Sequence, residues 1–133
     1  MARPRSGHPT VLELAILKIL WQDSPQSVQD VRESLAAGSP GRDLTHSSVI
    51  TMLNIMVRKK YLKRTKRSRA YLFQPIVSER DVNRGMLGDL VDRVFDGSAK
   101  SVMLELLETS DIDVEDIAEI RRMINRKARK KSE

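Results

Sequence analysis

The residues that could do chemistry in this 133-residue chain gather between positions 45 and 69. One group is a run of hydroxyl, imidazole and amide side chains: Thr45, His46, Ser47, Ser48, Thr51 and Asn54. The other is a basic window that contains no acidic residue: Arg58, Lys59, Lys60, Lys63, Arg64, Lys66, Arg67 and Arg69. A merely solvated face usually mixes both signs of charge, whereas an unbroken basic run is typical of a surface that binds a polyanion.

A helix predicted from about 46 to 60 would carry the first group on its outward face. Free amides at its start favour a phosphate, and we expect His46 to contact one. Thr45 is the predicted N-cap, and whether it only caps the helix or also contacts DNA stays open. Asn54 has the donor and acceptor that pair with an adenine edge in the major groove.

Two further features of this region allow alternative interpretations. Ile50 is apolar on a polar face without an obvious packing partner, so it either meets a thymine methyl group or is an ordinary exposed residue. Lys59 and Lys60 either bind DNA or interact favourably with the dipole at the helix C-terminus. Arg67 and Arg69 lie at the predicted hairpin tip, and we expect them along phosphates or in the minor groove.

Composition and charge exclude several classes of function. The chain has no cysteine, and His8 and His46 are far apart, so we expect no metal site. It shows no nucleophile with a base beside it and no glycine-rich phosphate loop, so we expect neither enzyme activity nor a cofactor. No apolar run reaches about 18 residues and no signal peptide is apparent, which predicts a cytoplasmic protein that does not engage a membrane.

The charge is distributed unevenly along the chain. Residues 1–76 carry 13 Lys and Arg against five Asp and Glu, a net charge of +8, whereas residues 77–133 carry a net charge of −2. The polyanion surface is therefore expected in the N-terminal part.

The N-terminal part reads as three helices and a hairpin. Thr10 with Glu13, and Ser27 with Asp30, have capping-box spacing at the start of helices at 10–21 and from about 28. After the helix at 46–60, residues 61–65 and 70–76 read as strands that flank Lys66–Arg69. This order predicts a winged helix-turn-helix, whose third helix enters a major groove.

The C-terminal part is predicted to be helical, with apolar stripes that need a partner. The stripe residues predicted to form a homodimer interface are Val82, Met86, Leu90, Val94, Val102, Leu106, Ile117, Ile120 and Ile124. The fold class is thus mainly α with a small β hairpin. We divide the chain into a flexible N-terminal arm (1–9), a winged-helix domain (10–77), a helical dimerisation region (78–128) and a basic tail (129–133).

Short motifs follow in a fixed order along residues 10–125: Thr10-x-x-Glu13-x-x-Ile16-Leu17-x-x-Leu20-Trp21, Ser27-Val28-x-x-Val31, Thr45-x-x-Ser48-Val49-x-Thr51-x-Leu53, Tyr61-Leu62-x-Arg64, Tyr71-x-Phe73-x-Pro75 and Phe95-x-Gly97-Ser98-x-Lys100-Ser101. Together they resemble the penicillinase-repressor family (BlaI/MecI type) of winged-helix transcriptional repressors. The resemblance implies a homodimer with interlocked C-terminal helices that binds a palindromic double-stranded DNA operator. The paired cysteines of copper-responsive relatives are missing here.

The resemblance also implies release from DNA by a signalling protease that responds to a membrane sensor and cuts the C-terminal region. The family's usual cut lies at an Asn–Phe junction, where this chain has Glu105 and Leu106. The familiar protease need not recognise that pair. Residues 109–111 are the accessible alternative, or a plain helix connection.

Two other functions remain as rivals to a sequence-specific repressor. A winged helix can act as a protein-interaction module, but its recognition face would then be neutral or acidic. The chain could also be an architectural protein that binds nucleic acid without sequence choice. Binding to an operator fragment against scrambled duplex separates this last alternative from the repressor.

Overall fold

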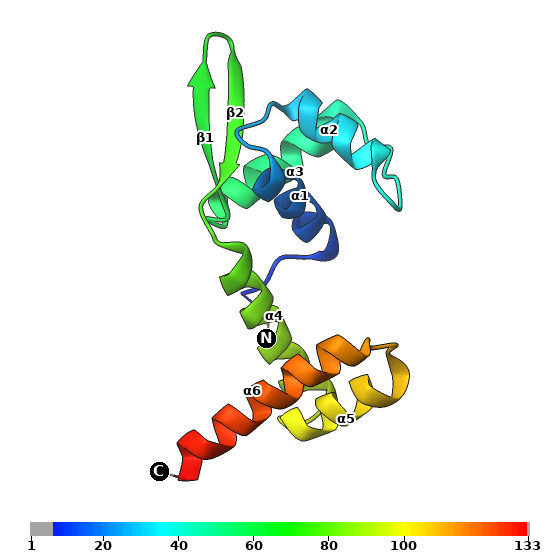
Figure 1. Cartoon of the computed structure of the whole chain (residues 1–133). Coiled ribbons are helices and arrows are strands. Elements are labelled where there is room, and N and C mark those ends of the chain that lie inside the picture. The colour runs from blue at the N-terminus through cyan, green and yellow to red at the C-terminus, as the bar shows by residue number, and fades with distance from the viewer. Residues whose placement is uncertain (1–6, 133) are drawn as a thin grey trace. The chain divides into compact units, whose positions relative to one another are not determined.

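The computed structural model describes residues 7–132 of the chain, which divides into two compact units at Gly88 and Asp89. Figure 1 shows unit 1 with its helices α1 to α3 and the β1–β2 hairpin. The predicted arm at 1–9 lies partly outside the described residues. Of its described part, Pro9 is buried and the carbonyl oxygen of Gly7 accepts a hydrogen bond of 3.4 Å from the Tyr61 hydroxyl.

Helices α1 (Val11–Gln22) and α2 (Val28–Ala37) begin where the capping boxes predict. Thr10 and Ser27 each accept a hydrogen bond from the third backbone amide of their helix, and the acidic residue there reaches back to the cap. The residues of α1 that are buried recur at helical spacing, namely Glu13, Ile16, Leu17 and Leu20. Local backbone chemistry therefore fixes the start of both helices.

Helix α3 (His46–Arg58) ends two residues before the predicted position. Lys60 has φ of 69°, its amide donates to the Val57 carbonyl, and the Tyr61 amide donates to the Met56 carbonyl. This pair of bonds is a Schellman motif, which satisfies free carbonyls of the last turn and redirects the chain into the hairpin. A lysine occupies the left-handed position that glycine usually takes.

Strands β1 (Leu62–Arg67) and β2 (Ala70–Pro75) pair antiparallel, with Arg64 opposite Phe73 and Lys66 opposite Tyr71. Lys66 and Arg67 thus belong to β1, and the prediction that they form the turn is wrong. The turn has two residues, Ser68 and Arg69, and Ser68 has φ of 57°. Strand β1 is therefore longer than predicted, and Lys66 and Arg67 lie within it rather than in the turn.

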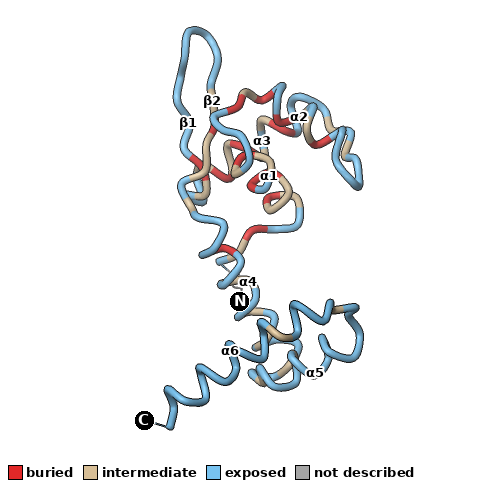
Figure 2. Tube along the Cα trace, in the orientation of Figure 1, coloured by how far each residue is buried: buried red, intermediate tan, exposed pale blue. Residues whose placement is uncertain are grey.

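The core of unit 1 lies where α1, α2, α3 and the base of the hairpin meet, as the buried segments in Figure 2 show. Phe73 of β2 is fully buried, and its backbone exchanges two hydrogen bonds with Gln26 before α2. The Trp21 indole also donates to the Val77 carbonyl at 2.9 Å. These contacts fix the hairpin against the helices, giving three helices and a hairpin in winged-helix order, as predicted.

Helix α4 (Glu79–Val94) crosses the division between the units, which lies beyond the predicted boundary at residue 77. Val82 of this helix is only 9% exposed in the single chain. Its apolar surface is already covered within the single chain, which argues against its predicted place on a dimer surface.

Helices α5 (Ala99–Thr109) and α6 (Val114–Ser132) contain no buried residue. Figure 2 shows α5 and α6 exposed along nearly their whole length. Residues 129–131 form the last turn of α6 rather than a tail that follows it. Among the described residues, no helix is both long and apolar enough to cross a membrane.

Candidate nucleic-acid interface

The start of α3 presents a cluster of exposed hydroxyl groups. The Thr45 hydroxyl oxygen accepts the Ser48 amide at 3.1 Å and also lies 2.9 Å from the Ser48 hydroxyl. Thr45 is therefore the helix cap, and His46, Ser47 and Thr51 stay exposed around it. This surface offers hydroxyl donors and a helix N-terminus to an anionic ligand.

Asn54, in contrast, is tied to the hairpin. Its Oδ1 accepts a hydrogen bond of 2.8 Å from Arg64 Nη1, and the guanidinium of Arg64 lies 4.6 Å from the centre of the Tyr71 ring. The ammonium of Lys66 lies 5.9 Å from the same ring. An Asn that reads adenine must use both its carbonyl and its amide, so Arg64 would have to release Asn54 first.

The register explains why Arg64 reaches α3. Opposite residues of a ladder share a face, so Arg64 lies on the face of buried Phe73, and Lys66 lies on the same face above Tyr71. Sequence reasoning placed neither Arg64 nor Tyr71 among the individual binding residues. Strand alternation counted from Leu62 could have found both, but only with the register known.

Ile50 is not the isolated apolar residue that the sequence predicts. It is partly buried and packs against the core of unit 1. It also lines a groove of about 330 Å³ between the starts of α2 and α3 and the hairpin, together with Ser27, Val28, Gln29, His46, Arg69, Ala70 and Tyr71. A thymine contact by Ile50 remains a prediction, but the premise that it lacks a packing partner is wrong.

Lys59 differs from the other basic residues of the window because it is already paired. Its Nζ lies 2.8 Å from Oε2 of Glu13, a residue only 1% exposed. The other oxygen of Glu13 accepts the Thr10 amide at 2.9 Å. One buried carboxylate thus holds the start of α1 and the end of α3 together, and Lys59 is not a free cation for DNA.

The remaining basic residues are exposed and form no ion pair within residues 7–132. They lie on the last turn of α3, the turn that follows it and the hairpin: Arg58, Lys60, Lys63, Lys66, Arg67 and Arg69. Their charges are uncompensated, which makes this surface strongly electropositive.

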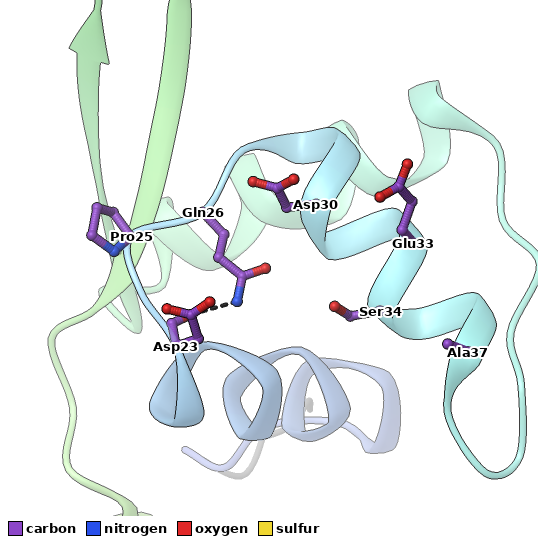
Figure 3. A pocket seen from close by; sticks show the side chains of 7 residues that line it. All are labelled: Asp23, Pro25, Gln26, Asp30, Glu33, Ser34 and Ala37. Carbon is purple, nitrogen blue, oxygen red and sulfur yellow. Dashed lines mark hydrogen bonds between the residues drawn. The ribbon is translucent and has the colours of Figure 1, made fainter.

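Three acidic residues of unit 1 lie together outside this basic surface. Asp23, Asp30 and Glu33 line a pocket of about 430 Å³ formed by α2 and the segment before it, which Figure 3 shows. The Gln26 amide there donates to the backbone carbonyl of Asp23. Neither this pocket nor any other place in residues 7–132 brings together three His, Cys, Asp or Glu side chains that could hold a metal. These three carboxylates are therefore not part of the basic surface formed by the end of α3 and the hairpin.

The model of the penicillinase repressor family matches residues 9–126. The chain belongs to the penicillinase repressor family. Membership places it among transcriptional repressors, which are not enzymes, as the sequence predicts.

Individual relatives resemble the chain along most of its length. The methicillin resistance regulatory protein MecI of Mammaliicoccus sciuri is 22% identical over 115 residues, which cover 86% of this chain and 91% of the relative. The penicillinase repressor of Bacillus licheniformis is 25% identical and covers 91% of this chain and 92% of its own length. The transcriptional regulator BlaI of Mycobacterium tuberculosis is 28% identical over 107 residues, which cover 79% of this chain and 75% of the relative.

Proposed function

We propose that this repressor binds double-stranded operator DNA as a homodimer, with α3 in the major groove and the hairpin along the backbone. The observation that carries the proposal is the basic, acid-free surface of the α3 end and the hairpin, which adjoins the exposed hydroxyl face of α3. A helix fits a major groove, and cations beside it bind the flanking phosphates. Family membership supports the same function.

The residues have different roles in this proposal. Arg67 and Arg69 supply sequence-independent attraction to phosphates from the hairpin. Ser47 and Thr51 face base edges, and Asn54 joins them once Arg64 turns to a phosphate. Lys59 contributes by fixing α3 rather than by touching DNA.

The first experiment compares single substitutions on specific and random duplex. Arg67→Ala should weaken both and make the slope of log K against log salt shallower by about 0.9, because the variant neutralises one phosphate fewer. Thr51→Ala should cost about 1–3 kcal/mol on the cognate duplex alone. Lys18→Ala removes an exposed charge from α1 and is the matched control, which should bind like wild type. Equal losses on both duplexes for Thr51→Ala would favour binding without sequence choice.

Exposed apolar side chains in the C-terminal helices support the homodimer. Leu106 of α5 is 51% exposed, and Ile120 and Ile124 of α6 are 46% and 52% exposed. Helices α4 to α6 also expose Leu90, Val94, Met103, Leu104, Leu107 and Met123. A second copy would cover these residues and present two α3 helices to a palindrome. Sedimentation at micromolar concentration should show a dimer, and Ile120→Glu should shift it to monomer. A monomeric wild-type protein contradicts this part of the proposal.

We also propose that a proteolytic cut in the C-terminal region relieves repression. Glu105 and Leu106 lie inside α5, where a protease would have to unwind the helix, whereas α5 ends at Thr109 with Ser110 as its cap. The segment after Thr109 is therefore the more accessible place for a cut. Separating the halves would forfeit an avidity gain of about 10²–10⁴. Immunoblots of cells treated with a cell-wall antibiotic test this, and a stable full-length band during derepression excludes proteolytic release.

A further inference from the structure

The end of α6 is the second strongly basic segment of the chain. Residues 121–131 contain seven basic side chains and no acidic one: Arg121, Arg122, Arg126, Lys127, Arg129, Lys130 and Lys131. All are exposed, and none forms an ion pair within the part of the chain that the structure describes. The winged-helix surface does not include this segment.

Helix stability does not explain so much positive charge. Cations favour a helix C-terminus only within its last turn, and here they begin three turns before the end of α6 at Ser132. Arg122, Arg126 and Lys130 follow one another at four-residue spacing, as do Lys127 and Lys131. Like charges at this spacing repel each other and destabilise a helix. A bound polyanion would relieve that repulsion.

The density of charge matches that of a nucleic acid. At 1.5 Å per residue, residues 121–131 span about 15 Å, so α6 carries roughly one positive charge per 2 Å of its axis. Duplex DNA carries one negative charge per about 1.7 Å. A groove of about 540 Å³, lined by Arg126, Lys127, Lys130, Lys131 and Met123, lies along this part of the helix.

The pattern around the helix argues against a membrane surface. After Ile124, Ala128 is the one apolar residue of α6. At about 100° per residue, the cations from Arg126 to Lys131 cover an arc of about 200°, and within these residues only Ala128 lies on the remaining side of the helix. A helix that lies on a membrane needs a continuous apolar face opposite its charges, and this segment has none.

We infer that the basic end of α6, residues 121–131, is a second binding site for the phosphate backbone of duplex DNA, independent of base sequence. The inference rests on the proposed function, because one duplex then accounts for both acid-free basic segments of the chain. The site would add affinity without specificity, since contacts to phosphates carry no information about base sequence.

The test uses the full chain and a long random-sequence duplex. The neutral variant carries Arg126→Gln, Lys127→Gln, Lys130→Gln and Lys131→Gln. The control variant carries Arg126→Lys, Lys127→Arg, Lys130→Arg and Lys131→Arg, so its charge and helix propensity are retained. The neutral variant should show a salt slope shallower by about 0.9 for each phosphate that it no longer neutralises, and the control should keep the wild-type slope.

Several outcomes overturn the inference. It fails if the neutral variant keeps the wild-type slope while Arg67→Ala still lowers it, and the proposed function then stands. It also fails if the slope changes only when sedimentation shows that the neutral variant has dissociated. If the neutral variant keeps the wild-type salt slope on duplex but no longer binds phosphatidylserine vesicles, the segment is assigned to a membrane instead. If it keeps that slope but no longer binds poly-glutamate, the segment is assigned to an acidic protein instead. If wild type binds no duplex, the proposed function itself is wrong.

Discussion

Replacing the two partners of the Glu13–Lys59 ion pair should have unequal effects on stability. Lys59→Met leaves Glu13, a residue only 1% exposed, with the Thr10 amide as the one remaining partner of its carboxylate within residues 7–132. Glu13→Gln keeps an oxygen for the Thr10 amide, and Lys59, whose side chain is 42% exposed, can turn to water. The buried charge is therefore the costly one to leave unpaired.

The expected losses in the free energy of unfolding differ between the two variants for the same reason. An unpaired buried charge costs about 3–5 kcal/mol, which we expect for Lys59→Met. Glu13→Gln loses one charge-assisted hydrogen bond, worth about 1.5–3 kcal/mol. The double variant, Glu13→Gln with Lys59→Met, has no buried charge left at this pair. It should therefore be more stable than Lys59→Met alone by about 1 kcal/mol or more.

Urea denaturation of wild type, both single variants and the double variant tests this cycle. All four proteins must be compared at one concentration, because the stability of a dimer depends on it. Lys60→Met is the matched control, since it removes a neighbouring exposed charge without a buried partner, and it should leave stability nearly unchanged. Additive losses in the double variant would refute the coupling, because they would mean that Glu13 and Lys59 act independently.

Three further substitutions test other parts of the structure. Lys60→Gly should raise the free energy of unfolding by about 0.5–1 kcal/mol because its φ is 69°, whereas Lys63→Gly within β1 should lower it, and urea denaturation measures both. Arg64→Gln should cost about 1 kcal/mol through its bond to Asn54, and an equal cost for Lys63→Gln on the other strand face would contradict that role. Phe73→Ala should cost about 3–5 kcal/mol in thermal or urea unfolding, and a loss below about 1 kcal/mol would show that the hairpin is not part of the core.

Much of the fold follows from residues close together in the sequence. The spacing of Thr10 with Glu13 and of Ser27 with Asp30 predicts two helix starts, and the structure confirms both. The change from helical to alternating periodicity near Tyr61 predicts the hairpin. The ends of elements were less predictable, because the Schellman turn at Lys60 and the turn at Ser68 place non-glycine residues at positive φ.

The partners of individual side chains depend on residues far apart in sequence. Counting along α1 identifies Glu13 as a capping residue, but nothing local indicates that its second oxygen meets Lys59. In the same way, Asn54 sits on the outward face of α3, yet only the ladder register brings Arg64 to it.

The sequence by itself determined which segments are helices, where the hairpin lies and that one region is basic without acidic residues. These properties depend on backbone capping, on periodicity and on composition, which act over a few residues. Only the tertiary structure decided that Lys59 is paired, that Ile50 is packed and that Val82 is covered. Those outcomes depend on how distant elements pack, and packing geometry is not contained in the spacing of residues along one element.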